Sequence, residues 1–341
     1  MNHTHYRIFQ FRQYNPQGEL NLAVTAAAHF TIGPAGLSLD TDQPDPLLAD
    51  QYFGDNPHGH LRAQADFVPY KPAGDVTALA VSHAPSGRPE RSWQAEIHIR
   101  SRVKRLALHG PRFWLPEGRE DWRLGDAEPV PSIPVDYYRA FGGSVTGSDP
   151  VEVLPDNPLG PGMIRAGVTP RDRPLPAPQI ESPDDPVLDW RKSHRPEGIA
   201  PIAPWWGQRS RHAGSYDDSW RKTHHPFLPQ DFDYAFYNCA HPDLIQPVAL
   251  IPGEPVRLVN LHTRLRDFTV ALPRDLPGVI VRYPGEDRRL PMLMDGAHFD
   301  LLGEEPKLRV TWRTAIPLDR RPIAELHVGL IPAAAPAAEG A

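Results

Sequence analysis

The stretch Trp93-Gln-Ala-Glu-Ile-His-Ile-Arg100 decides the fold class, because its side chains alternate between apolar and polar. Trp93, Ala95, Ile97 and Ile99 lie on one side of an extended chain, and the polar residues between them lie on the other. This period of two is typical of a β-strand with one buried face. We therefore predict a half-buried antiparallel strand over residues 93–100.

The same alternation recurs toward both ends of the chain and predicts further strands of this kind. Its apolar members are Leu106 and Leu108, then Phe268, Val270 and Leu272, then Val279, Val281 and Tyr283, and finally Leu308, Val310 and Trp312. Residues 20–30 are rich in alanine, but their leucine and valine side chains alternate, so we interpret the segment as a strand. Asp295-Gly296 lies between two apolar segments, and we predict a tight two-residue hairpin turn there.

The chain is rich in proline, with 42 prolines in 341 residues. Interior proline removes a helix hydrogen bond and clashes with the preceding turn, so we expect only short helices, at residues 184–192 and 216–222. The 8 Trp, 12 Phe and 10 Tyr residues supply core material that disordered chains lack. The predicted fold class is mainly β, with antiparallel β-sandwich-like lobes, long proline-rich structured loops and few short helices.

The strand pattern also divides the chain along its length. Residues 1–125 are predicted to form an N-terminal β lobe, and residues 236–331 a C-terminal β lobe. Residues 126–235 form a proline-rich and aromatic-rich loop region between them, and residues 332–341 are interpreted as a mobile tail. The pattern leaves open whether the two lobes are separate or form one continuous sandwich.

Charge and cysteine content limit the classes of function. The net charge of −6 argues against a nucleic-acid binder, since neutralising phosphates needs a basic surface. No apolar run is long enough to span a bilayer, and no secretory signal precedes the first predicted strand, so we expect no membrane partner. Cys239 is the only cysteine, which fits a reducing cytoplasm; the thiol is either a buried filler or a nucleophile.

Histidines occur in close pairs that could bind a metal if folding joined them to a carboxylate. The pairs are His3 with His5, His58 with His60, and His224 with His225. No cysteine pair or zinc-protease motif accompanies them, so we expect neither a metal nor another cofactor.

Aspartates in the middle of the chain allow two interpretations. Asp231 and Asp233, together with Asp217, could serve a hydrolase or carbohydrate-active enzyme, because two carboxylates in different surroundings can split their pKa values. In an extended segment, however, residues two apart share a face, and Arg209 or Arg211 could hold either aspartate in a buried structural ion pair. The structural interpretation predicts no catalytic residues.

Exposed aromatic and arginine side chains are the usual anchors of protein interfaces. The loop region supplies five candidates for such anchors, and any of them that are buried would belong to the core instead. The candidate binding residues are Tyr137, Tyr138, Trp205, Trp206 and Arg211.

Several motifs of the loop region occur in the order found in one family. They are Tyr138-Arg-Ala-Phe-Gly-Gly143, Asn157-Pro-Leu-Gly160, Leu175-Pro-Ala-Pro-Gln-Ile-Glu181, Trp206-Gly-Gln-Arg209, Gly214-Ser-Tyr-Asp217 and Leu228-Pro-Gln-Asp-Phe-Asp233. On these motifs the sequence resembles domain-of-unknown-function family 2169, which is found in bacterial type VI secretion gene clusters. The residues assigned to the structural motif are Arg139, Gly142, Gly143, Asn157, Gly160, Arg209, Tyr216, Asp217, Trp220, Asp231 and Asp233.

The resemblance implies an adaptor or chaperone without an established enzymatic activity. Its expected partners are a secretion effector protein, a spike-tip protein of the valine-glycine-repeat or PAAR type, or both. Loading would take place in the cytoplasm, before the spike is assembled.

Overall fold

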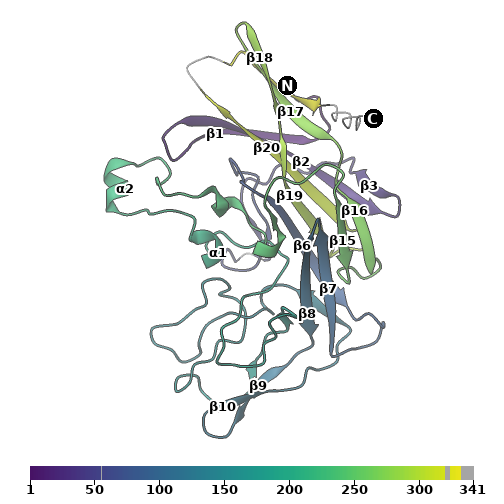
Figure 1. Cartoon of the computed structure of the whole chain (residues 1–341), viewed down its shortest axis with the longest axis vertical. Coiled ribbons are helices and arrows are strands. Elements are labelled where there is room, and N and C mark those ends of the chain that lie inside the picture. Colours follow the sequence, from purple (N-terminus) through teal and green to yellow (C-terminus); the bar gives the residue numbers. More distant parts are fainter. Residues whose placement is uncertain (55, 319–322, 332–341) are drawn as a thin grey trace, which may run out of the picture.

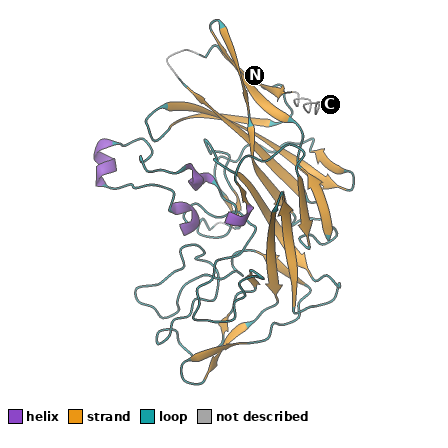
Figure 2. Cartoon of the chain, viewed as in Figure 1, coloured by secondary structure: helices purple, strands orange, loops and turns teal. Residues whose placement is uncertain are grey.

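The computed structural model describes residues 1–54, 56–318 and 323–331, and it is mainly β, with loops between many strands (Figures 1 and 2). The largest sheet has eight strands. Its main path is β1 (Arg7–Tyr14), β2 (Leu20–Gly33), β20 (Lys307–Pro317), β19 (Leu293–Asp300), β6 (Gly74–His83) and β11 (Ser132–Val135), with β14 (Ile245–Gln246) beside β6 and β3 (Gly36–Leu39) beside β2. β19 pairs with β6 in parallel, and the other pairs of this sheet are antiparallel.

A second antiparallel sheet has five strands. In order they are β13 (Ile180–Glu181), β8 (Arg102–His109), β7 (Ser92–Ile99), β15 (Pro255–Val259) and β16 (Asp267–Ala271). Smaller sheets contain β18 (Glu286–Pro291), β17 (Leu276–Tyr283) and β21 (Glu325–Ile331), then β10 (Asp121–Leu124), β9 (Phe113–Glu117) and β12 (Leu175–Pro176), then β4 (Gln51–Tyr52) and β5 (Leu61–Ala63). The helices are short: α1 (Gly207–Ser210), α2 (Asp218–Thr223) and the 3₁₀ turns η1 (Tyr234–Tyr237) and η2 (Pro242–Leu244).

The main hydrophobic core joins the two large sheets. The predicted inward side of β7, from Trp93 to Ile99, is buried and belongs to the same cluster as Val24 of β2, Val76 of β6 and Val310 of β20. The prediction of half-buried strands is therefore confirmed for β7. Residues 20–30 also form a strand, as predicted, and so do the alternating segments within β8, β16, β17 and β20.

Strands from the two ends of the sequence are interleaved in the eight-stranded sheet. β2 from the first 125 residues pairs along its length with β20 from the last hundred, and β19 lies between β20 and β6. The boundaries at residues 125 and 236 thus do not separate two sheets. The middle region contributes edge strands, β11 to the first sheet and β13 to the second. The tail, residues 332–341, lies outside the described residues.

The prediction of a hairpin turn at Asp295-Gly296 is wrong. β19 continues from Leu293 to Asp300 on β20, and the register shifts between Met294 and Gly296, which is a β-bulge. The bulge turns Asp295 inward, where it accepts a hydrogen bond from Thr311 and pairs with Arg313 at 2.6 Å. Both charged side chains are about as buried as core residues, at 3% and 5% exposure. A buried ion pair, rather than a turn, explains this Asp-Gly.

A helix was also predicted over residues 184–192, and the structure has turns there instead. Val187 N donates to the Glu181 carboxylate, and Pro186 has no N–H to give to a helix. The second predicted helix is confirmed: α2 begins two residues after the start of the predicted segment, 216–222, and ends one residue beyond it. Among the described residues, no helix is long and apolar enough to cross a membrane.

Replacing Asp295 by alanine is expected to lower the free energy of unfolding by about 3 to 5 kcal/mol, because Arg313 then stays buried without a carboxylate. Urea titration followed by circular dichroism measures the change. The double variant Asp295→Ala/Arg313→Met removes both charges and should recover most of the loss. A single variant as stable as the wild type would show that the ion pair does not hold the bulge.

Candidate binding site

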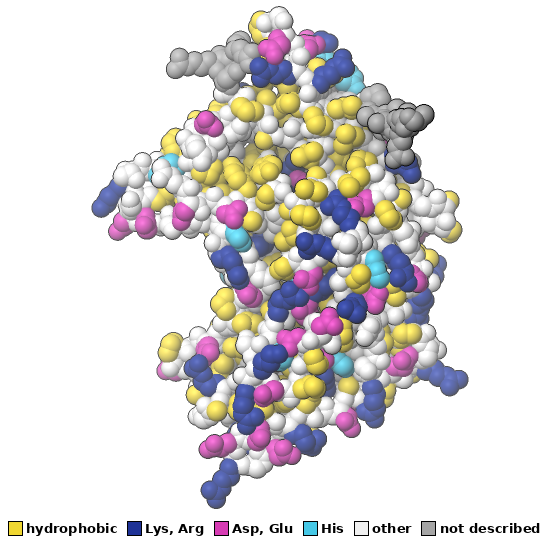
Figure 3. Space-filling view, viewed as in Figure 1, with side chains coloured by type: hydrophobic (Ala, Val, Ile, Leu, Met, Phe, Trp, Pro, Cys, Tyr) yellow, Lys and Arg dark blue, Asp and Glu magenta, His cyan; other side chains and the backbone are white. Residues whose placement is uncertain are grey.

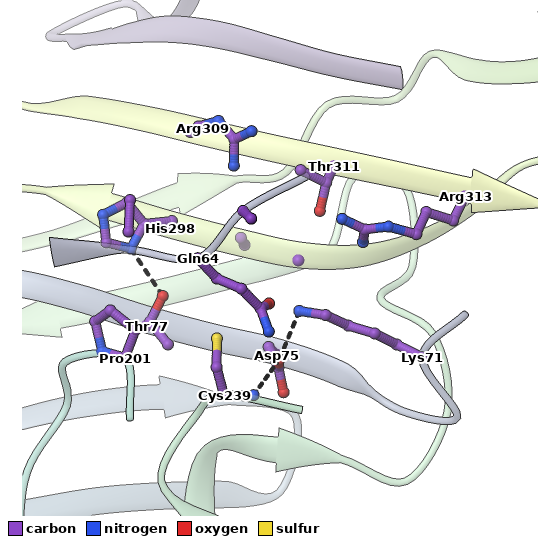
Figure 4. Close-up of a pocket in the computed structure, with 14 residues that line it drawn as sticks. Gln64, Lys71, Asp75, Thr77, Pro201, Cys239, His298, Arg309, Thr311 and Arg313 are labelled. Atoms are coloured by element: carbon purple, nitrogen blue, oxygen red, sulfur yellow. Dashed lines mark hydrogen bonds and ion pairs between the residues drawn. The ribbon is translucent and has the colours of Figure 1, made fainter. Parts of the chain in front are cut away.

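A buried polar layer lies between the eight-stranded sheet and the loops that cover it (Figure 4). Asp75, at the start of β6, is its centre: the carboxylate accepts from Lys71 Nζ, Asn238 Nδ2 and Cys239 N, each at 2.8 Å. Asp75 and Lys71 are almost fully buried, so their charges compensate each other away from water. This carboxylate attaches two loops, before β6 and after η1, to the sheet.

The polar layer encloses only a small cavity. Its volume is about 30 Å³, and its lining includes Gln64, Thr77, Cys239 and His298 (Figure 4). That is room for a water molecule and not for a substrate. Burial raises the pKa of the Cys239 thiol to about 12, so the thiol stays protonated at neutral pH and fits the buried filler better than the nucleophile.

One cluster of ligand-type side chains, Glu197, His241 and Asp243, has the spacing of a metal site. The ammonium group of Lys104 lies among them: it contacts Glu197 and lies 3.0 Å from Asp243 Oδ2 and 3.3 Å from His241 Nε2. Arg195 also pairs with Asp243, at 2.6 Å. Burial and then the Lys104 charge hold the pKa of His241 well below its usual value. Lysine and arginine thus supply the positive charge that a metal would bring.

The histidine pairs noted in the sequence lie in other places. His58 packs edge-on against Trp205, and His60 is buried beside Phe53 and Tyr138. His224 Nε2 lies 2.9 Å from the carbonyl oxygen of Pro16.

The glycine and asparagine motif forms a tight crossing of two loops. Asn157 is fully buried, and its Nδ2 donates to the carbonyl oxygens of Tyr137 and Phe141 at 2.9 and 3.0 Å. Gly143 N donates to the Asn157 carbonyl oxygen at 2.8 Å. A Cβ on Gly143 would lie 1.9 Å from the Gly160 carbonyl oxygen, and the φ of Gly143 is +82°. Only glycine fits this crossing, which explains the two glycine-containing motifs.

Arg209, Asp217, Asp231 and Asp233 are not paired with one another. Arg209 is buried and donates to the carbonyl oxygens of Ile202 and Phe236, both at 2.8 Å. Asp231 is exposed and accepts from the Ser215 backbone at 3.0 Å, and exposed Asp233 accepts from the Ala235 backbone at 2.9 Å. The expected buried ion pairs of these aspartates with arginine are therefore wrong, because the Arg209 guanidinium faces backbone carbonyls instead.

The aspartates act locally, each at the end of a turn or helix. Asp217 caps α2 by accepting from Trp220 N at 2.8 Å, and Asp233 caps η1. Tyr216 is half exposed and packs edge-on against Trp220, with ring centroids 4.8 Å apart. Each carboxylate has a separate structural partner, so the geometry offers no converging pair for acid and base catalysis.

The structure separates the five candidate binding residues into buried and exposed ones. Tyr137 and Trp206 are 0% and 1% exposed, so the prediction that they contact a partner is corrected: they belong to the core, where their rings meet edge-on. Tyr138 and Trp205 are 46% and 38% exposed. Arg211 is also exposed, and it pairs with Asp156 at 2.5 Å beside a separate hollow of about 330 Å³.

Exposed Tyr138 lines a pocket of about 280 Å³, which we call the Tyr138 pocket. Its walls come from four segments that are distant in the sequence. They are Phe53 and His60, Leu79 and Ala80 of β6, the segment from the end of β11 onward with Pro134, Val135, Asp136 and Tyr138, and Leu302. Most of this lining is apolar, and Phe53 and Leu302 are themselves 38% and 43% exposed.

Trp205 is connected to the Tyr138 pocket through residues 58–60. His58 contacts the Trp205 ring, and the Tyr138 hydroxyl lies so close to Gly59 that a Cβ there would be 3.3 Å away. Buried side chains contact both exposed rings: Trp206 packs edge-on against Trp205, with ring centroids 5.9 Å apart, and the His60 ring lies 6.1 Å from that of Tyr138. The sequence did not single out Phe53 or Leu302, which lack any local motif.

Fold and site together define a mainly β protein with long structured loops and an aromatic surface pocket. The chain belongs to the family DUF2169, described as an uncharacterized protein conserved in bacteria, whose model matches residues 17–313. Neither a curated protein nor a solved structure matches the chain.

Substituting Gly143 by alanine is expected to destabilise the fold by several kcal/mol, because the new Cβ meets the Gly160 backbone. Gly167→Ala is the matched control: Gly167 has φ +74°, and open space surrounds its Cβ position. The control should lose only about 1 kcal/mol, from its positive φ. Thermal and urea unfolding compare the two, and equal losses would refute the proposed clash.

His60 is expected to make stability depend on pH. Burial lowers the pKa of His60 from 6.5 to about 4, so the unfolded chain binds this proton more readily. The contribution of neutral His60 to the free energy of unfolding is fully present above pH 6.5. It is lost as the pH falls from 6.5 toward 4, by about 3 kcal/mol. His60→Phe should lose less stability than the wild type between pH 7 and pH 4, measured by urea titration. Parallel profiles for the two proteins would contradict this.

Proposed function

We propose that this chain is a non-catalytic adaptor or chaperone of a type VI secretion system. It binds an effector protein, a spike-tip protein of the valine-glycine-repeat or PAAR type, or both, in the cytoplasm for loading. The resemblance of its motifs to a family found in such gene clusters supports this role. Membership of DUF2169 is consistent with this role, and the description of the family assigns no activity to its members.

The observation that carries the proposal is the Tyr138 pocket. An apolar hollow of about 280 Å³ beside exposed tyrosine and tryptophan rings can take one or two apolar side chains of a partner protein. The rings are held by buried neighbours, so little conformational entropy is lost when a partner binds. Such a preorganised pocket supports binding without requiring any reactive group.

The hydrolase or carbohydrate-active alternative needs Asp217, Asp231 and Asp233 to converge. Each of them is instead engaged in a local hydrogen bond, with Trp220 N, Ser215 and Ala235 N respectively. No observation therefore favours that alternative over the adaptor.

Loading also constrains the strength of binding. The adaptor must hold its cargo and then release it at the spike, which suits an interface of standard size, on the order of 1,200 to 2,000 Å². In such an interface a few aromatic anchors supply most of the binding energy. We assign Tyr138 and Trp205 to this role, with Phe53 and Leu302 as apolar neighbours.

Alanine substitution of Tyr138 or Trp205 is expected to weaken capture of the partner at least tenfold, because each removes an anchor worth about 2 kcal/mol. The measurement is co-expression with the effector and spike-tip proteins encoded beside the gene, followed by pull-down and titration. Tyr70→Ala is the matched control, since Tyr70 is 43% exposed and also packs edge-on against another ring.

Each outcome of this experiment has a definite meaning. Loss of capture in the Tyr138 and Trp205 variants, with normal capture by the control, supports the assigned surface. If none of the three substitutions affects capture, the partner binds another surface of the protein. A folded wild-type protein that captures none of these products refutes the adaptor proposal.

A further inference from the structure

Arg209 of α1 is a buried cation without a carboxylate partner. Its side chain is nearly inaccessible to water, and it forms no ion pair with any described residue. Nε and Nη1 donate to the carbonyl oxygens of Phe236 and Ile202, and the Phe236 ring centroid lies 5.3 Å from Cζ. These contacts are all with neutral groups, so the buried positive charge is left without a counter-charge. Nη2 has no hydrogen-bond partner among the described residues, and it is not sealed from solvent.

The guanidinium lines a hollow of about 330 Å³, which we call the Arg209 hollow. Three arginines line it, Arg195, Arg209 and Arg211, with one carboxylate, Asp156. His212 also lines it and faces an exposed carboxylate that lies outside the lining. Figure 3 shows charged and histidine side chains on the surface near the place where Figure 1 labels α1. The Arg209 hollow and the Tyr138 pocket have no lining residue in common.

The other two arginines of the lining have carboxylate partners. Arg211 pairs with Asp156 at 2.5 Å. Arg195 belongs to the cluster around Lys104, in which two cations face two carboxylates. Among the described residues that line the hollow, Arg209 is therefore the arginine whose charge is left over. A ligand that completes the charge balance carries a single negative charge.

The motif Trp206-Gly-Gln-Arg209 builds one wall of the hollow. Trp206 is buried in the core, and a Cβ on Gly207 would lie 2.6 Å from the Asp156 carboxylate, so the backbone is held close to the neighbouring loop. Gln208 and Arg209 both line the hollow. The Gln208 side chain makes no hydrogen bond with a described residue, and its Oε1 is buried without a partner. The motif therefore brings an amide and a guanidinium with free hydrogen-bonding groups to the same hollow.

A second part of the lining is apolar. It consists of Ile202, Ala235, Ala240, Pro242 and Ile245. These residues offer no charge and no side-chain hydrogen bond, so they suit the hydrocarbon part of a ligand. The hollow has the size of a small ligand site, in which a few polar groups fix the orientation and apolar walls supply contact area.

We propose that the Arg209 hollow binds a carboxylate that carries a short apolar group. Its carboxylate accepts hydrogen bonds from Arg209 and from the Gln208 amide, and its hydrocarbon packs on Ile202 and Ile245. The planar guanidinium suits the two oxygens of a carboxylate, and one negative charge balances that of Arg209. A phosphate group would bring close to two charges. The carboxylate comes from a small carboxylic acid or from the C-terminal residue of another protein.

The first test compares two probes of the same shape, 4-methylpentanoate and its neutral amide, 4-methylpentanamide. Both are titrated into the full chain at constant ionic strength, with calorimetry and the melting temperature as readouts. The acid should bind and raise the melting temperature, since a ligand of the folded state stabilises it. The amide should bind at least tenfold more weakly. Equal binding of the two probes, or no binding of the acid, overturns the proposal.

The second test adds a carboxylate to the hollow. Truncating Arg209 would also free two buried carbonyl oxygens and could unfold the chain, so Gln208→Glu is the better variant. It keeps the shape of the side chain, and its negative charge should weaken binding of 4-methylpentanoate at least tenfold in a folded protein. Gln17→Glu is the matched control, because it makes the same charge change on an exposed turn between β1 and β2 and should bind normally. Binding by Gln208→Glu as tight as that of the control overturns the site.

A third titration distinguishes the two sources of the carboxylate. The probe is an acetylated Gly-Ala-Leu peptide, with a free or an amidated C-terminus. Tighter binding of the free peptide than of 4-methylpentanoate supports a protein C-terminus, and binding of 4-methylpentanoate alone supports a small acid. An amidated peptide that binds as well as the free one overturns carboxylate recognition. No secretion protein takes part in these tests, so their outcome is independent of the adaptor proposal.

Discussion

The buried carboxylate of Asp75 holds the covering loops to the sheet on which they depend. It accepts hydrogen bonds from Lys71, Asn238 and Cys239, so one side chain of β6 joins segments more than 150 residues apart. A charge at this depth is tolerated only because an ammonium group and two further donors compensate it. Two further ion pairs of this polar layer, Arg309 with Asp66 and Arg313 with Asp295, compensate buried charges in the same way elsewhere on the sheet.

Strands from the two ends of the sequence pair within the eight-stranded sheet, so both ends belong to the same structural unit. β2 and β20 pair over eleven residues although they lie far apart in the sequence. The loop region between them is closed by the crossing at Asn157 and Gly143, and this crossing positions Tyr137 and Tyr138. The crossing thus fixes the backbone beside the Tyr138 pocket, where the Tyr138 and Trp205 rings are exposed.

The sequence predicts the local structure better than the site. Period-two alternation identified β7, β8, β16, β17 and β20, because a half-buried strand imposes that pattern directly. The same reasoning failed at Asp295, where a bulge and a buried ion pair have the residue types of a tight turn. The local sequence pattern gives no information about Arg313, the distant ion-pair partner that decides between a turn and a bulge at Asp295.

The candidate site illustrates the same limit. Tyr137 and Tyr138 are adjacent and identical in type, yet one is buried and the other is 46% exposed. Phe53 and Leu302 meet in the pocket across about 250 positions of sequence, and no motif marks either of them. Glycine and asparagine at the crossing were singled out in advance only through the family resemblance, and the structure supplies the physical reason, a backbone approach too close for a Cβ at Gly143.

We propose the Tyr138 pocket as the surface that binds a secretion partner. Hydrogen–deuterium exchange of the chain, free and in complex with the effector or spike-tip protein encoded beside its gene, tests it most directly. We expect slower exchange on binding at residues 52–54, 58–60, 134–139 and 204–206. Slower exchange confined to other segments, or no change at these residues in a saturated complex, would contradict it.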